Sequence, residues 1–178
     1  MNILIIGNCG VGKTYVMTKL IELLNCNKKN KLGLMNYNTN GNINIVGNYD
    51  GSTFQGSDKL SMSVMTDVEN YLRNVKGINI FEGDRFMNSK FITKAKPFIF
   101  KIKGSGKQGR KLRSSQQTER QIKSISTRVS NINSDAEMPN SQTLLIILKS
   151  ALCKFNTTIE EELQLIKQMY KPKQTQLF

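Results

Sequence analysis

The sequence contains no histidine and no tryptophan, only three prolines, and half as many acidic as basic residues. The absence of histidine excludes the commonest general base, so any proton acceptor must be a carboxylate, a lysine, a tyrosine or water. A zinc site is also disfavoured, because Cys9, Cys26 and Cys153 show no C-x-x-C spacing and no histidine can complete a ligand set. We expect free thiols, as in a cytoplasmic protein.

Long apolar runs are missing as well. No stretch reaches the roughly 18 apolar residues that a membrane span requires, so we expect no membrane association. No basic segment precedes the first apolar run, which argues against a secretory signal. The 178 residues suffice for one α/β domain with a hydrophobic core and fall short of two. We predict a single cytoplasmic domain over residues 1–178, with its oligomeric state left open.

Positive charge is abundant, and it is unevenly distributed. The net charge is +13; residues 1–86 hold 9 basic and 7 acidic side chains, whereas residues 87–178 hold 17 and 6. Against a single acid, Glu119, the segment 103–128 contains Lys107, Arg110, Lys111, Arg113, Arg120, Lys123 and Arg128. Such a distribution predicts a polyanionic partner, with nucleic acid foremost. The alternative is a solvated basic surface that only aids solubility.

The segment that organises the chain begins at Gly7, where the sequence matches the phosphate-binding pattern G-x-x-x-x-G-K-[ST] at every fixed position. An apolar, β-branched run at residues 3–6 predicts a buried strand before it, and helical spacing of apolar residues predicts a helix from about Gly12. We therefore predict bound ATP and Mg²⁺, with Lys13 reaching the β/γ-phosphates and the Thr14 hydroxyl binding the metal. The backbone N–H groups that would cradle the phosphates belong to Asn8, Cys9, Gly10, Val11, Gly12, Lys13 and Thr14.

Alternating strand and helix patterns follow the loop. Strands are predicted near residues 44–46, 78–81, 98–102 and 129–132, and helices at 59–75, 86–94, 141–155 and from 158 to about 170. We predict an α/β fold with a doubly wound, parallel, five-stranded sheet flanked by helices. The basic segment 103–128 would form a partly helical lid, and residues 133–140 a loop.

Acidic residues follow the predicted strand at 78–81. In a doubly wound sheet, ligands gather at the carboxyl ends of the strands, so Glu82 and Asp84 would point toward the phosphate loop, provided that their strand lies beside the first. One of these two acids would be the second anchor for Mg²⁺. Arg85 could pair with a substrate phosphate. The structural alternative for Asp84 is the N-cap of the following helix.

Asp84-Arg85-Phe86, followed by Ser89, resembles a segment of thymidylate and deoxynucleoside kinases. A longer series resembles the phage-type P-loop DNA kinases: GNY at 47–49, FQGSDKLSM at 54–62 and EGDRFMNSKFI at 82–92. Residues 113–117, Lys123, Thr127-Arg128 and Asn131-Ile132 extend the likeness, which covers about residues 2–132. The resemblance implies an ATP-dependent kinase acting on the hydroxymethyl group of 5-hydroxymethyluracil in phage DNA, a step of thymidine hypermodification.

On this reading Asp58 would orient or deprotonate the acceptor hydroxyl; alternatively it is a plain helix N-cap. Arg110, Arg113 and Arg120 would close on the transferring phosphoryl group. Tyr49 and Phe54 could stack on the target base, with core packing as the alternative for Phe54. Hydroxymethylcytosine, or a free nucleoside or nucleoside monophosphate, is a possible acceptor too. A third possibility is a non-catalytic nucleotide-binding protein.

Overall fold

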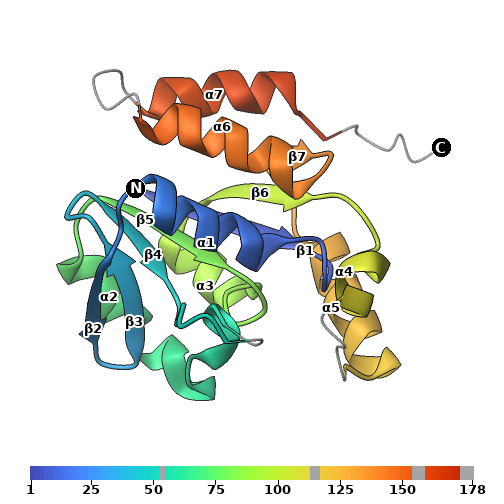
Figure 1. Cartoon of the computed structure of the whole chain (residues 1–178), viewed down its shortest axis with the longest axis horizontal. Helices are drawn as coiled ribbons and strands as arrows, with labels where there is room; N and C mark the ends of the chain where they lie inside the picture. Colours follow the sequence, from blue (N-terminus) through green and yellow to red (C-terminus); the bar gives the residue numbers. More distant parts are fainter. Residues whose placement is uncertain (53–54, 113–116, 154–158, 173–178) are drawn as a thin grey trace.

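A seven-stranded sheet forms the central layer of the structure, a computed structural model that describes residues 1–52, 55–112, 117–153 and 159–172 (Figure 1). The strand order is β2-β3-β4-β5-β1-β6-β7. The strands are β1 (Asn2–Gly7), β2 (Lys28–Leu32), β3 (Met35–Thr39), β4 (Ile43–Val46), β5 (Ile78–Glu82), β6 (Phe98–Ile102) and β7 (Ala136–Met138). The predicted α/β class is confirmed, with a mostly parallel sheet flanked by helices.

The prediction of five strands is wrong, because a hairpin extends the sheet. Strands β4, β5, β1, β6 and β7 are mutually parallel, and β2 and β3 add to β4 in antiparallel pairs. Lysine and asparagine dominate the hairpin, and their low strand propensity conceals it in the sequence. A distant contact helps to hold its turn: the Leu34 N–H donates to Asp67 Oδ2 over 2.6 Å.

The last strand also differs from the prediction. Residues 129–131 belong to a helix that spans Glu119–Asn131, and the edge strand is β7 at Ala136–Met138, where a loop was expected. Ile125 and Val129 are four residues apart and both buried, so this segment follows helical spacing. Although the composition of residues 129–132 is typical of a strand, residues 129–131 continue the helix that begins at Glu119.

Helices cover both faces of the sheet (Figure 1). They are α1 (Lys13–Leu23), α2 (Val68–Asn74), α3 (Ser89–Ala95), α4 (Lys107–Leu112), α5 (Glu119–Asn131), α6 (Ser141–Cys153) and α7 (Ile159–Met169). The helix predicted over 59–75 forms only in its second half. Two 3₁₀ turns, Ser57–Lys59 and Met62–Thr66, precede α2, and the Ser61 hydroxyl accepts from the Ser63 N–H. Such local side-chain bonds compete with a continuous α-helix.

Two hydrophobic cores lie on opposite faces of the sheet. Ile3 and Ile5 pack with α1, α6 and α7, whereas Leu4 and Ile6 pack with α2, α3 and α5. Burial on both faces explains why β1 is apolar without interruption. No described helix has the length and apolar character needed to cross a membrane.

A buried asparagine network ties β1, β4 and β5 together. The Asn79 carbonyl oxygen accepts from the Asn44 amide (3.0 Å) and the Tyr71 hydroxyl (3.2 Å), and the Asn79 amide donates to Asn2 Oδ1 (3.0 Å). Asn79 is 3% exposed. Because buried polar groups without partners are costly, this network must remain complete.

We expect Asn79→Ala to lower the free energy of unfolding by about 3 kcal/mol, because it leaves several buried groups without their partner. Urea denaturation measures the change. The control is Asn74→Ala, since Asn74 is exposed and bonds only to Asn70 one turn earlier. A loss no larger for Asn79→Ala than for the control would contradict a stabilising role for the network.

Candidate functional site

The phosphate loop connects β1 to α1. Gly10 and Gly12 have φ angles of +84° and +94°, a left-handed conformation that glycine adopts without strain. Helix α1 begins directly after Gly12, and no side chain caps its first turn. A loop curled in this way at an uncapped helix N-terminus is a suitable binding site for an anion.

Lys13 and Asn8 brace the loop. The Lys13 ammonium donates to the carbonyl oxygens of Gly7 (2.9 Å) and Asn8 (3.1 Å), so its charge is held at the loop. The Asn8 amide donates to Gly104 O (2.8 Å), which links the loop to the segment after β6. Asn8 Oδ1 is buried and has no hydrogen-bond partner among the described residues.

Glu82 reaches the loop because its strand is the neighbour of β1. Strands β1 and β5 pair in parallel, with Ile5 opposite Glu82. The Thr14 hydroxyl donates to Glu82 Oε1 over 3.4 Å, and Glu82 is only 3% exposed. The expectation that this strand lies beside the first is confirmed. A hydroxyl and a carboxylate at this position are the protein ligands that Mg²⁺ takes beside a nucleotide.

The described residues contain no group of three or more His, Cys, Asp or Glu side chains that could hold a metal ion. Magnesium differs from zinc in this respect, since it keeps several waters and binds through one or two carboxylates together with substrate phosphates. The Thr14–Glu82 pair therefore fits Mg²⁺ in the presence of a nucleotide, and it does not fit a metal held by protein alone.

Asp84 has a different partner. Its two carboxylate oxygens lie 2.7 and 3.0 Å from Nη1 and Nη2 of Arg128 in α5, a two-pronged ion pair. Helix α3 is capped by Asn88, whose side chain accepts from the Phe91 N–H, so the alternative of Asp84 as its cap is wrong. Of the two acids predicted to bind metal, Glu82 is the one that contacts Thr14.

We expect the Asp84–Arg128 pair to be worth about 1 kcal/mol, because both side chains are partly exposed. A double-mutant cycle of Asp84→Asn and Arg128→Met, followed by urea denaturation, measures this coupling. Coupling indistinguishable from zero would mean that the pair does not hold α5 to the end of β5.

The loop that carries Asp58 lies over the end of β5. A methyl group added at Gly56 would overlap Glu82 Oε1 and lie 3.6 Å from Thr14 Cγ2. One added at Gly83 would lie 2.6 Å from Ser57 Oγ and 3.8 Å from Asp58 Oδ1. Asp58 is part of a 3₁₀ turn that begins after Gly56 and has no side-chain cap, so the helix-cap alternative is wrong. The structure thus brings Thr14, Glu82 and Asp58 to one edge of the sheet.

The Ser57 hydroxyl and the Tyr49 side chain also lie near this edge. Ser57 is fully buried, and its hydroxyl has no hydrogen-bond partner among the described residues. Burial, reinforced by the negative charges of Glu82 and Asp58, raises the pKa of Tyr49 well above its ordinary value. Tyr49 donates to Val46 O (3.3 Å) and belongs to the core on the α1 face. Stacking of Tyr49 on a base is therefore not supported, and Phe54 lies outside the described residues.

The candidate arginines have different positions. Arg110 Nη1 donates to Cys9 O (2.8 Å) and Ser105 O (2.7 Å), so it touches the phosphate loop. The Nε atom of Arg85 is buried and has no hydrogen-bond partner in the described chain. Arg120 is exposed in the first turn of α5, and Arg113 lies outside the described residues. The structure therefore brings Arg110 to the loop. For Arg120 it shows no contact with the described residues of the site.

Helix α4 packs directly against the phosphate loop, a contact that the sequence analysis did not foresee. Methyl groups added at Gly106 and Gly109 would overlap the carbonyl oxygens of Cys9 and Gly10. Only glycine allows such close approach of two backbones. The paired glycines in the basic segment were the available signal. Arg128 was part of the family likeness, but nothing in the sequence indicated that its partner is Asp84.

The fold and this edge define an α/β protein with a mostly parallel sheet and a phosphate-loop sequence at the carboxyl end of β1, a class compatible with nucleotide binding. Comparison with protein-family models, curated proteins and solved structures finds no match for this chain.

Proposed function

We propose that this protein is a magnesium-dependent P-loop kinase that phosphorylates the hydroxymethyl group of a modified pyrimidine in DNA. The observation that carries the proposal is the convergence of Thr14, Glu82 and Asp58 at the edge of the sheet where the phosphate loop ends. The resemblance of residues 2–132 to phage-type DNA kinases favours 5-hydroxymethyluracil as the acceptor. The reaction would take place in the cytoplasm of the host cell.

The donor half of the site would hold ATP. Backbone N–H groups from Asn8 to Thr14 bind the phosphates, and the Lys13 ammonium exchanges its two carbonyl partners for phosphate oxygens. Thr14 and Glu82 would hold Mg²⁺, which would supply positive charge to offset that of the nucleotide phosphates. Arg110, already at the loop, and Arg85, whose Nε lacks a partner, add positive charge where the transferred group passes.

The acceptor half would be organised by Asp58. Its carboxylate accepts a hydrogen bond from the hydroxymethyl group, whose oxygen then attacks the γ-phosphorus atom. As the new O–P bond forms, the bond between the γ-phosphorus and the bridging oxygen breaks and ADP leaves. The hydroxyl proton passes to Asp58. Because the chain contains no histidine, a carboxylate is the suitable proton acceptor at this position.

Labelling with γ-³²P-ATP tests the proposal. Duplex DNA containing 5-hydroxymethyluracil should acquire label, and the same duplex with thymine in its place should not. Label on free nucleosides or nucleoside monophosphates, with none on DNA, would favour the small-substrate kinase, which shares the same fold. The net charge of +13 favours the polymeric acceptor. ATP binding without any labelled acceptor would favour a non-catalytic nucleotide-binding protein.

A further inference from the structure

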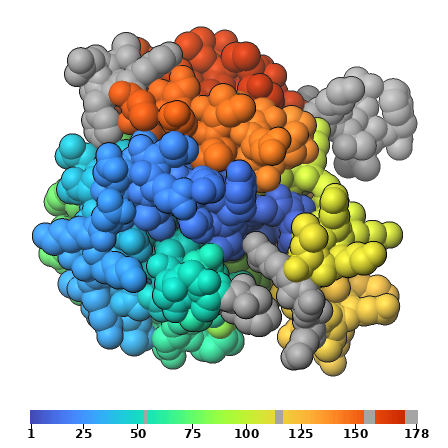
Figure 2. Space-filling view, viewed as in Figure 1, coloured from blue at the N-terminus to red at the C-terminus, as the bar shows by residue number. Residues whose placement is uncertain are grey.

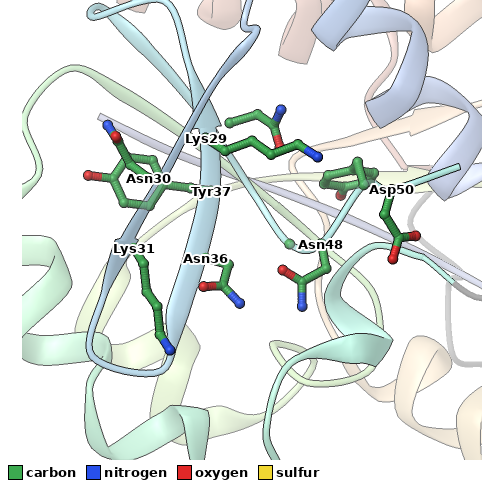
Figure 3. Close-up of a pocket in the computed structure, with 10 residues that line it drawn as sticks. Lys29, Asn30, Lys31, Asn36, Tyr37, Asn48 and Asp50 are labelled. Atoms are coloured by element: carbon green, nitrogen blue, oxygen red, sulfur yellow. The ribbon is translucent and has the colours of Figure 1, made fainter.

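A second polar hollow lies beside the hairpin that the sequence analysis missed. It has a volume of about 320 Å³ and opens between β2, β3 and the loop after β4 (Figure 3). The described residues that line it are Lys29, Asn30, Lys31, Asn36, Tyr37, Asn38, Gly47, Asn48, Tyr49 and Asp50. Two lysines and four asparagines thus line this hollow.

The spacing of the hairpin explains this concentration. Lys29 and Lys31 alternate with their neighbours along β2, so both lie on the same face of the sheet. In the antiparallel register they pair with Asn38 and Asn36 of β3. Figure 3 shows Lys29 extending toward the loop that carries Asn48 and Asp50. Donor groups therefore approach the hollow from both the hairpin and the loop.

The charge of the hollow is positive despite Asp50. The Asp50 carboxylate lies 2.6 Å from the Lys59 ammonium and accepts from the Ser52 hydroxyl. The hydrogen bond from Lys59, and to a smaller extent those from Ser52, hold the pKa of Asp50 well below its usual range. No ion pair joins Lys29 or Lys31 to an acid in the described part of the chain. Two uncompensated positive charges therefore remain in the hollow.

Lysines on an edge strand also serve to prevent edge-to-edge association. That role explains their presence on β2, but it does not explain the amide groups that face them across a concave surface. Lys28 provides the comparison, because it lies on the same strand and the opposite face. It lines a different hollow, which also includes Lys76.

A single loop connects the residues of the hollow to the candidate site. Asn48 and Gly56 exchange two backbone hydrogen bonds, of 3.0 and 2.7 Å. Asn48 lines the hollow, and Gly56 lies against Glu82 and near Thr14. In Figure 2 the hairpin and the basic helices α4 and α5 lie on opposite sides of residues 57–66. A chain-like anion crossing the site would meet positive charge on both sides.

We propose that this hollow is a polynucleotide subsite that binds the phosphodiester backbone of DNA beside the acceptor nucleotide. The lysines neutralise phosphate charge, and the partly exposed amides of Asn36 and Asn48 donate to phosphate oxygens, whereas the buried Asn38 amide already donates to Cys26 O. The identity of the neighbouring nucleotide as the acceptor rests on the proposed function. Binding of the backbone itself does not, since it requires neither ATP nor a hydroxymethyl group.

The test is binding of an unmodified, fluorescein-labelled single-stranded DNA of 12 nucleotides, without ATP, measured by fluorescence anisotropy over a range of salt concentrations. The double variant Lys29→Ala/Lys31→Ala should weaken binding by about 5- to 20-fold near 0.1 M salt. It should also reduce the slope of log K against log salt by about 0.7 for each lysine. The matched control is Lys28→Ala/Lys76→Ala, which removes the same charge from the opposite face and should have a much smaller effect.

Three results would overturn the subsite. They are unchanged binding by Lys29→Ala/Lys31→Ala, an equal loss in both double variants, and displacement of the DNA by an equal phosphate concentration of deoxynucleoside monophosphate. Circular dichroism verifies that the variants fold, and Lys29→Gln/Lys31→Gln repeats the measurement with polar side chains at the sheet edge. If the hairpin variant alone loses DNA binding while no DNA is labelled by ATP, the subsite stands and the kinase proposal fails.

Discussion

Lys13→Ala should lower the rate of phosphoryl transfer by about 100- to 1000-fold, the loss typical of removing one group that stabilises charge in the transition state. The Lys13 ammonium is held at the phosphate loop by two carbonyl oxygens, 2.9 and 3.1 Å away. No other described lysine makes such a bond to this loop, and Arg110 contacts it at a different carbonyl oxygen, that of Cys9. Initial rates with γ-³²P-ATP, together with ATP affinity by calorimetry, measure the effect.

The matched control for this variant is Lys19→Ala. Lys19 lies in the same helix, but its ammonium is exposed and pairs with Glu22 at 2.6 Å. Its removal should leave transfer nearly unchanged, because a surface ion pair contributes little to stability. If Lys13→Ala folds normally and retains the rate of the control, the phosphate loop has no part in the reaction.

Asp58→Asn should lower turnover by about 100- to 10,000-fold, the range for loss of a positioned general base. Asparagine keeps the size of the side chain and removes the negative charge that accepts the proton. Affinity for ATP should change little, since Asp58 lies on the loop over β5 and the proposed phosphate site is at residues 8–14. The measurement is kcat for DNA phosphorylation beside the dissociation constant of ATP.

Glu69→Gln serves as the control for Asp58→Asn. Glu69 is an exposed acid of α2 that pairs with Lys94 at the surface, where hydrogen bonding to Lys94 lowers its pKa. We expect no change in turnover for this variant. Near-normal turnover of Asp58→Asn would remove Asp58 from the chemistry and leave another carboxylate, a lysine, a tyrosine or water as the proton acceptor.

Three features of the fold were predictable because their signals are local. The phosphate loop, β1 and α1 follow from residues 3–24, where a buried strand, a glycine-rich turn and an amphipathic helix adjoin. The adjacency of β1 and β5 was a condition of the predicted site, and the structure meets that condition. The contact of Thr14 with Glu82, 68 residues away, is a consequence of that adjacency.

The β2–β3 hairpin, the Asp84–Arg128 ion pair and the asparagine network depend on long-range contacts that no local sequence pattern predicts. The hairpin β2–β3 is rich in asparagine and lysine, and Asp67 helps to hold its turn. Asp84 and Arg128 are 44 residues apart, and each has several other possible partners in the sequence. Asparagine enrichment suggested no role in the sequence, yet Asn2, Asn44 and Asn79 form a buried network across three strands.

The sequence by itself determined the class of the fold, the phosphate loop and the candidate residues Lys13, Thr14, Glu82 and Asp58, since each is carried by a short segment with its own physical signal. Tertiary structure alone decided which candidates meet. In the folded chain Glu82 contacts Thr14, and Asp84 forms an ion pair with Arg128. The turn with Asp58 lies over the end of β5, and α4 packs on the phosphate loop. Tertiary structure also creates the hollow of Lys29 and Lys31. The reason is that several residues of the same charge compete for each oppositely charged partner. The strength of each pairing depends on the distance between the charges in space, which separation along the chain does not specify.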